Sequence, residues 1–145
     1  MKEKTIVFFA RYYMYLVLAL VVAYLLSYTG LVVPLVLTAA FSLTSVFVAK
    51  ILKYLFAKKR GGGSSLFVAK NKYAFPSSHA AGLSSILLST FGNYLWPFLL
   101  GSTIIILLAR VKSGVHDYMD ILAGVITGLV VTATCIGTLA LLLSI

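Results

Sequence analysis

Three long stretches without acidic or basic side chains constrain this chain more than any other feature. Residues 12–49 and 121–145 contain no Asp, Glu, Lys, Arg or His, and residues 73–109 contain none of these apart from His79. A helix needs about 20 apolar residues to cross the hydrocarbon core of a bilayer, which is roughly 30 Å thick. The first two of these stretches in chain order, 12–49 and 73–109, are each long enough for a pair of crossings. Residues 121–145 are long enough for one.

The composition supports a membrane location. Hydrophobic residues make up 61% of the chain, charged residues make up 10%, and the mean hydropathy is +1.07. A soluble domain needs far more charge to cover its surface. We therefore expect an all-α fold, a polytopic membrane helical bundle that forms a single membrane-embedded domain over residues 1–145. Because the first stretch lacks a small-residue cleavage site, we expect a retained helix there and no cleaved signal peptide. The single Cys135 allows no intramolecular disulfide.

Turn residues divide the stretches into about five transmembrane helices. Residues 27–30 supply a turn, and Pro34 then falls in the first turn of the next helix, where proline is tolerated. Residues 91–93 break the later stretch, and Trp96 suits a membrane–water interface. The predicted helices cover 4–28, 31–57, 77–90, 94–110 and 117–143, with a flexible Gly- and Ser-rich loop over 58–75.

Two further expectations concern these helices. The third and fourth are short for a full crossing, which predicts that one end lies below the membrane surface in a cavity. Gly124 and Gly128 form a GxxxG pair, which permits close packing of helices. Such a pair is common by chance in apolar segments, so it receives little weight in the sequence interpretation.

The positive charges are expected to lie at one face of the membrane. The net charge is +9, and five crossings place all the basic residues on the same side: Lys2, Lys4, Arg11, Lys50, Lys53, Lys58, Lys59, Arg60, Lys70, Lys72, Arg110 and Lys112. The positive-inside rule assigns this face to the cytoplasm. A second reading is an anion-binding site, because phosphate groups are held by several cations or N–H donors. The two readings are compatible.

His116 and Asp120 are candidates for catalysis. Their spacing of four residues predicts a shared helical face and a hydrogen bond. A carboxylate that binds one imidazole nitrogen fixes the tautomer and makes the other nitrogen a better nucleophile. Asp120 also lies at the edge of an apolar helix, where an ionisable residue is by default a functional candidate.

The segment 75–79 adds a second candidate element. Pro76 ends any preceding helix, Ser77 is a suitable N-cap, and the free N–H groups of the next turn can bind an anion. His79 lies in that first turn and is a candidate functional residue. The alternative is a histidine that is only solvated at the membrane–water interface. Two histidines and one nearby aspartate, without thiolates or paired carboxylates, make a weak case for a metal site. We expect no cofactor and no nucleic-acid partner.

These residues resemble a known family. The segment Arg110-x5-His116-x3-Asp120 is similar to the third signature, SRxxxxxHxxxD, of the type 2 phosphatidic acid phosphatase (PAP2) superfamily. The segment 76–79, Pro-Ser-Ser-His, resembles its second signature, PSGH. Lys53-x6-Arg60 resembles the first, KxxxxxxRP. The three occur in the family's order, and the helices from 31 to 143 follow its core arrangement.

The chain departs from the signatures at three positions. Gly61 replaces the proline and loosens the placement of Arg60, Ser78 replaces the glycine, and Ala109 replaces the serine that precedes Arg110. Ser78 keeps a small residue whose backbone N–H can still point at phosphate, whereas Ala109 loses a hydroxyl. None of these changes removes a side chain that the family's chemistry requires.

The resemblance implies a metal-independent, two-step hydrolysis of a lipid phosphate. It assigns His116 as the nucleophile, Asp120 as its orienting carboxylate and His79 as the general acid and base. It implies that the phosphoryl oxygens are held by Lys53, Arg60, Ser77, Ser78 and Arg110. Lys58 and Lys59 are expected to be solvated loop charges.

The sequence does not distinguish between several lipid phosphate substrates. Phosphatidic-acid-like lipids and polyprenyl phosphates or diphosphates, such as undecaprenyl diphosphate, present the same headgroup chemistry. A phosphotransferase would use an alcohol in place of water. The alternative from another class is a non-catalytic protein that binds or transports anionic lipids. Against it, the charges gather at one face and none lies mid-span.

Overall fold

The computed structural model describes residues 19, 32–58 and 73–145. This part of the chain contains the helices α2 (Val32–Phe56), α3 (Ser78–Ser89), α4 (Trp96–Lys112) and α5 (Tyr118–Leu143). They match the last four predicted helices to within two residues at each end, so the all-helical class is confirmed. The predicted helix over 4–28 and most of the loop, including Arg60, lie outside the described residues. Five crossings therefore stay a prediction.

Two of these helices are long and apolar enough to cross a bilayer. They are Val33–Phe56, with a mean hydropathy of 2.0, and Tyr118–Leu143, with a mean hydropathy of 2.2. The share of each apolar window that is buried is 17% and 11%, which differs from the core helix of a soluble protein. The 12 residues of α3 and the 17 of α4 are shorter than a full span, as the sequence predicted. These properties are consistent with a membrane protein.

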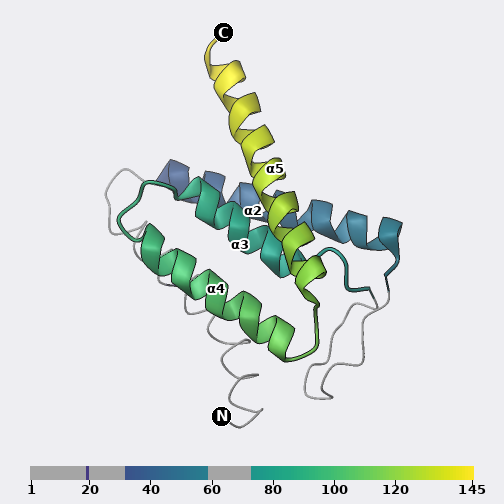
Figure 1. Cartoon of the computed structure of the whole chain (residues 1–145). Helices are drawn as coiled ribbons and strands as arrows, with labels where there is room; N and C mark the ends of the chain where they lie inside the picture. The colour runs from purple at the N-terminus through teal and green to yellow at the C-terminus, as the bar shows by residue number, and fades with distance from the viewer. Residues whose placement is uncertain (1–18, 20–31, 59–72) are drawn as a thin grey trace.

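Helix α3 is the central element of the described fold. It packs against α2, α4 and α5, and α5 also contacts α2. In Figure 1, the axes of α2, α3 and α4 are similarly inclined, with α3 antiparallel to the other two, and α5 crosses α2 and α3 steeply before its C-terminal part extends beyond them. This crossing brings the first turns of α3 and α5 close together.

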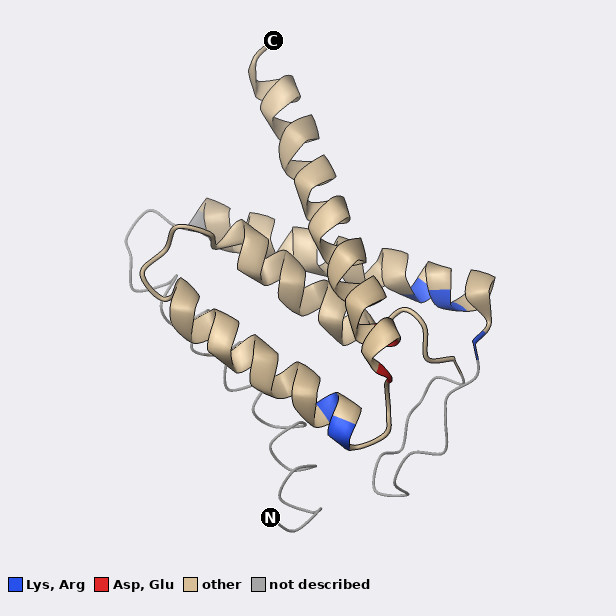
Figure 2. Cartoon of the chain, in the orientation of Figure 1, with Lys and Arg blue, Asp and Glu red and all other residues tan. Residues whose placement is uncertain are grey.

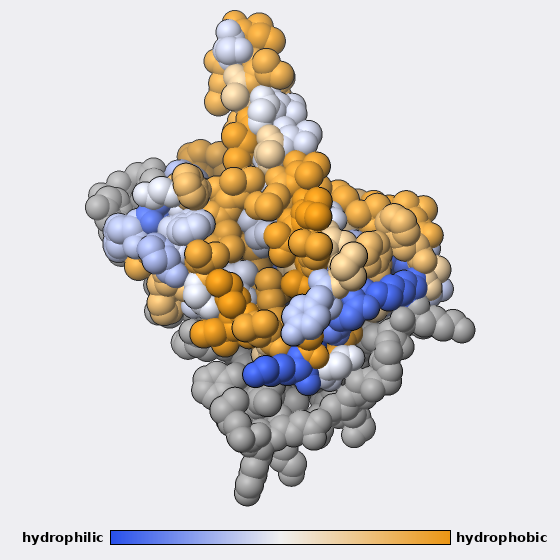
Figure 3. All heavy atoms as spheres, in the orientation of Figure 1, coloured by the Kyte–Doolittle hydropathy of each residue, from blue (hydrophilic) through white to orange (hydrophobic). Residues whose placement is uncertain are grey.

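Small residues form the contact between these helices, and large apolar residues face outward. Side chains with no exposed surface include Ser45, Ala49, Ala80, Ala81, Ser85 and Thr132. Large apolar side chains such as Leu43, Phe47 and Leu55 are more than 60% exposed, and apolar surface covers much of the face shown in Figure 3. Lipid gives no hydrophobic drive for helices to associate, so membrane helices rely on close packing of small residues.

The two glycines of the GxxxG pair lie at the contact of α5 with α3. A methyl group added at Gly124 would clash with the carbonyl oxygen of Ser77 and would lie 2.8 Å from the Cβ of Ala80. One added at Gly128 would clash with the Ser84 hydroxyl and the Ala81 carbonyl oxygen. The low weight given to this motif was wrong, because both glycines allow the backbones to approach closely.

The described charges gather at one end of the helices, as the sequence predicted for the whole chain. Figure 2 shows the basic residues at the C-terminal ends of α2 and α4, and the acidic residues at the start of α5. The described members of this group are Lys50, Lys53, Lys58, Arg110, Lys112, Asp117 and Asp120. The remaining Lys and Arg residues lie outside the described part.

Candidate active site

The N-terminus of α5 is fixed by a reciprocal pair of hydrogen bonds between two aspartates. The Asp120 N–H donates to Asp117 Oδ1 at 2.8 Å, and the Asp117 N–H donates to Asp120 Oδ2 at 3.2 Å. This is a capping box, which satisfies two N–H groups that the helix leaves unpaired. The sequence signal was an aspartate followed three residues later by another acid.

The predicted pair of His116 and Asp120 is brought together at this helix start. His116 Nδ1 lies 3.5 Å from Asp120 Oδ2, and both side chains are almost fully buried. The expectation of a shared helical face was wrong, because α5 begins at Tyr118 and His116 precedes the N-cap Asp117. The extended backbone of that cap, with φ −88° and ψ 172°, takes the chain out of the helix. His116 still reaches Asp120 from outside it.

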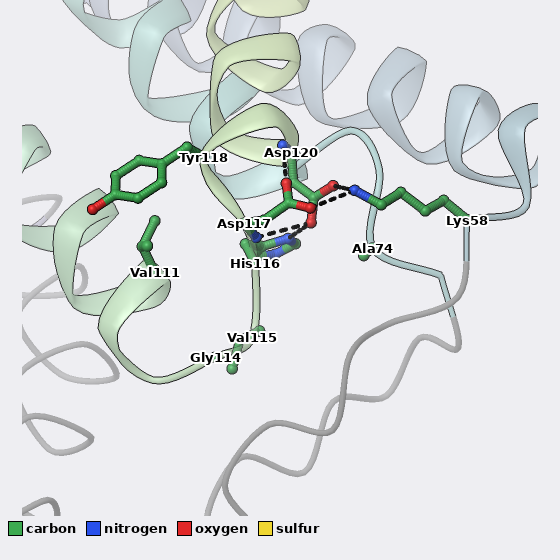
Figure 4. A pocket seen from close by; sticks show the side chains of 9 residues that line it. All are labelled: Lys58, Ala74, Val111, Gly114, Val115, His116, Asp117, Tyr118 and Asp120. Atoms are coloured by element: carbon green, nitrogen blue, oxygen red, sulfur yellow. Dashed lines mark hydrogen bonds and ion pairs between the residues drawn. The ribbon is translucent and has the colours of Figure 1, made fainter.

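Lys58 joins this pair from the end of α2. Its Nζ lies 2.6 Å from Asp117 Oδ2 and 2.8 Å from Asp120 Oδ1, and 5.8 Å from the centre of the Phe75 ring (Figure 4). Lys58 is therefore an exposed charge after the helix, as expected, but it also forms ion pairs with both carboxylates, which the sequence did not predict. The partners lie 59 and 62 residues away along the chain, so no local pattern could indicate them.

These contacts shift the pKa values of Lys58 and Asp117, which both lie outside the helices. The hydrogen bonds to Asp117 and then to Asp120 raise the pKa of Lys58 above its usual value. The hydrogen bond from Lys58, followed by one from the Asp120 N–H, lowers the pKa of Asp117. Each shift favours the charged form, so the pair is an ionised salt bridge near neutral pH.

The start of α3 packs directly on the start of α5. The Ser77 N–H donates to the Asp120 carbonyl oxygen at 2.9 Å, and the Ser77 hydroxyl caps α3 by accepting from the Ala80 N–H at 3.4 Å. The buried Lys53 of α2 donates from Nζ to the Ser78 hydroxyl at 3.3 Å. The structure thus brings together three of the predicted phosphate-binding residues, Lys53, Ser77 and Ser78. The half-buried His79 follows in the same turn of α3.

Arg110 lies in the last turn of α4 and is buried. Its carbonyl oxygen accepts from the Ser113 hydroxyl at 3.0 Å and from the His116 N–H at 3.4 Å. The short segment from Arg110 to His116 therefore connects α4 to the start of α5, and both of its end residues are predicted site residues. Arg60, the remaining predicted phosphate ligand, lies outside the described residues.

An open pocket of about 350 Å³ lies beside the His116–Asp120 pair. Figure 4 shows its lining residues, which are Lys58, Ala74, Val111, Gly114, Val115, His116, Asp117, Tyr118 and Asp120. The predicted phosphate-binding side chains Lys53, Ser77, Ser78 and Arg110 are not among them, nor is His79. This pocket therefore opens on the carboxylates and their lysine.

Comparison with known proteins finds a distant relative. The chain is 35% identical to sphingosine-1-phosphate phosphatase 2 from Homo sapiens over an alignment that covers 43% of this chain and 18% of that protein. The Mus musculus protein of the same name is also 35% identical, with 43% of this chain and 20% of the relative covered. The chain thus spans about a fifth of the length of these relatives. No family model matches, and no solved structure matches. The comparisons thus indicate distant homology to a lipid phosphatase.

Proposed function

We propose that this chain hydrolyses a lipid phosphate or diphosphate, without a metal ion, through a phosphohistidine at His116. The observation that carries the proposal is the buried pair of His116 and Asp120, with the N-terminus of α3 packed against it. The three sequence signatures and the distant similarity to a lipid phosphatase support the same reaction class.

In this proposal the His116 Nδ1–H donates a hydrogen bond to Asp120, which fixes the tautomer and leaves Nε2 free to attack. In the first step Nε2 forms a bond to phosphorus, the bond from phosphorus to the lipid oxygen breaks, and His79 donates a proton to that oxygen. In the second step His79 takes a proton from water, the water oxygen attacks phosphorus, and the N–P bond breaks. Inorganic phosphate leaves, and both histidines return to their starting state. For a lipid diphosphate, the leaving group of the first step is the lipid monophosphate.

The negative oxygens of the phosphoryl group need positive charge and N–H donors around them. Lys53 supplies the first, because it is buried and already contacts Ser78 at the start of α3. The N–H groups of that first turn supply the second, since a helix N-terminus favours anions. In this proposal, Arg110 and Arg60 complete the set, and Ser77 holds the turn in place.

A lipid substrate fits the distribution of polar and apolar surface. The charged groups lie at one end of the helices, while the long sides of α2 and α5 expose apolar residues such as Phe47 and Ile126. A phosphate headgroup would bind at the charged end, with its acyl or prenyl chains along these helices. Phosphatidic-acid-like lipids, phosphorylated sphingoid bases and polyprenyl phosphates or diphosphates all have this form.

The test is phosphate release by the purified chain from a panel of these lipids, with and without a chelator. We expect turnover that the chelator does not affect. His116→Ala should lower turnover by at least about 1,000-fold, as is typical for loss of a nucleophile, and should form no phosphoenzyme. His79→Ala should form a phosphoenzyme that is hydrolysed slowly. Two results would contradict the proposal. The first is that the chain releases no phosphate with or without the chelator, and the second is that His116→Ala keeps full turnover. In the first case a binding or transport role would explain the site better.

We also propose that the active-site end faces the cytoplasm of a multi-pass protein in the cell membrane. The support is the excess of Lys and Arg predicted on that side. A Gly62→Cys variant in a Cys135→Ser background tests this in intact cells. Protection from an impermeant thiol reagent is expected, and labelling from outside would show the opposite orientation.

A further inference from the structure

Lys58 is the residue of this site that the proposed chemistry leaves without a role. It lies just after α2, at a position that the first signature leaves unspecified, yet its ammonium contacts Asp120, the carboxylate beside His116. We propose that Lys58 is a positioning residue, which holds the Asp120 carboxylate in the orientation that His116 requires. The inference rests on the proposed function, because it assigns Lys58 to the same reaction.

The two oxygens of Asp120 have separate partners. Oδ1 accepts from Lys58 Nζ at 2.8 Å. Oδ2 accepts from the Asp117 N–H at 3.2 Å and faces His116 Nδ1 at 3.5 Å. A carboxylate turns about a single bond, so the contact at Oδ1 also sets the direction of Oδ2. Loss of Lys58 would leave Oδ1 of a buried side chain without this charged partner, and the group could turn away from His116.

Lys58 is itself held in place from two further sides. Asp117 binds the ammonium at 2.6 Å through Oδ2, while Asp117 Oδ1 caps the helix. The Phe75 ring lies 5.8 Å from Nζ, within the range of a cation–π contact. Figure 4 shows the lysine reaching across the pocket to both carboxylates. Because Asp117 and Phe75 also hold the ammonium, it can in turn fix Asp120.

The local charge argues against Lys58 as a phosphate ligand. Its single positive charge faces two carboxylates, so Lys58, Asp117 and Asp120 together carry a net charge of −1. A phosphate that approached Lys58 would have to displace both aspartates and would meet their repulsion. Lys53, which contacts the start of α3, is better placed to hold an anion. The contacts of Lys58 therefore favour positioning over substrate binding.

A positioning cation also has an electrostatic signature. The charged and titratable groups around the His116–Asp120 pair are Lys58 and Asp117, together with Lys53 of α2, His79 of α3 and Arg110 of α4. Lys58 places a positive charge 2.8 Å from Asp120 Oδ1. Loss of this charge should move the acid limb of the activity profile to higher pH.

The experiment compares Lys58→Met, Lys58→Gln and Lys58→Arg in the full chain, with the lipid substrate that the wild type turns over. The control is Lys50→Met, because Lys50 is exposed on the same helix and its loss changes the net charge equally. We expect Lys58→Met to lower kcat by about 10- to 100-fold, the effect of a small misplacement of reacting groups. KM should change by less than about threefold. The acid limb should shift upward as above.

The other variants separate geometry from charge. Lys58→Gln keeps a hydrogen-bond donor, so it should recover part of kcat but keep the shifted acid limb. Lys58→Arg keeps the charge, so it should recover most of kcat and the wild-type acid limb. Lys50→Met should match the wild type in both. Thermal unfolding of each variant checks that the fold is retained, and Lys58→Gln carries the test if Lys58→Met does not fold.

Two results would overturn the inference while the proposed function stands. In the first, Lys58→Met and Lys58→Gln have wild-type kcat and pH profiles. In the second, KM and the inhibition constant of inorganic phosphate rise by more than tenfold while kcat and the acid limb are unchanged, which is the pattern of a phosphate ligand. Failure of the proposed function is recognised separately, because the wild type itself would then release no phosphate.

Discussion

The two halves of α5 have similar apolar composition but opposite surroundings. In the first half, residues 118–132, every fourth residue is buried: Asp120, Gly124, Gly128 and Thr132. In the second half, residues 133–145, no residue is buried within the described part of the chain, and Figure 1 shows this half extending beyond the other helices. The difference follows from α3, which has 12 residues against 26 for α5 and therefore ends before α5 does.

This comparison shows that the register of small residues, more than hydrophobicity, decides where α5 packs. Positions 120, 124, 128 and 132 carry a carboxylate, two glycines and a threonine, whereas the next position in the series is Ile136, which is 42% exposed. The packed half also carries the site, because Asp120 begins the buried series. Four predictions test this division of the helix, from the largest expected effect to the smallest.

Asp120→Asn should give the largest change in activity. The amide can still accept from the Asp117 N–H, so the cap is kept, but it cannot stabilise the charge that develops on His116. We expect kcat to fall by about 1,000-fold or more, as when an amide replaces the carboxylate that orients a catalytic histidine. Asp117→Asn makes the same chemical change at the N-cap, where asparagine is well tolerated, and should lose less than about tenfold. Similar losses for both would contradict the role of Asp120.

Gly128→Ala should give the largest change in stability. The added methyl group would clash with the Ser84 hydroxyl and the Ala81 carbonyl oxygen, so the helices must separate. Overpacking of this kind costs about 1–3 kcal/mol or more. Gly137→Ala is the matched control in the other half, because its methyl group would meet no described atom within 4 Å. That control should be neutral or stabilising by up to about 1 kcal/mol. Reversible unfolding in detergent measures both, and equal effects would remove the distinction between the halves.

Ser85→Ala tests the polar contact at the end of the packed half. The Ser85 and Thr132 hydroxyl oxygens are 2.6 Å apart, and both residues are fully buried. A hydrogen bond between membrane helices contributes about 0.6 kcal/mol on average and up to about 1.7 kcal/mol, so we expect a loss in this range. Thr134→Ala removes an exposed hydroxyl that bonds within its own helix. It should change stability by less than about 0.5 kcal/mol, and a larger loss there would contradict the comparison.

The salt bridge of Lys58 with Asp117 should give the smallest effect, a weak dependence of stability on pH. Lys58 lowers the pKa of Asp117, so the folded form of this carboxyl binds a proton less readily than the unfolded form. Its contribution is therefore present above the usual value of 3.8 and is lost as the pH falls through the lowered pKa. The pKa of Lys58 is raised, so its contribution is present below 10.5 and is lost as the pH rises through the raised value.

Both side chains of this salt bridge are more than a third exposed, so solvent and salt weaken it, and we expect less than about 1 kcal/mol at neutral pH. Unfolding of the wild type and of Lys58→Met from pH 3 to pH 7 gives the measurement. The variant should show less loss of stability on acidification at low salt, and the difference should shrink in high salt. If the difference between the wild type and Lys58→Met were the same in high salt, the variant would act through lost packing and not through lost charge.

Local patterns in the sequence predicted much of the fold and the main residues of the site. The apolar stretches and turn residues predicted α2 to α5 to within two residues at each end. Ser77 caps α3 as expected, and His116 and Asp120 are neighbours, although they do not share a helical face. These features depend on interactions within a few residues along the chain, such as helix periodicity, caps and contacts four residues apart. The sequence therefore contains their cause directly.

The tertiary structure alone decided the rest. It placed Lys58 on Asp117 and Asp120, and it set Gly124 against Ser77. Such contacts join segments about 50 to 60 residues apart and depend on how closely two backbones approach, which no local pattern specifies.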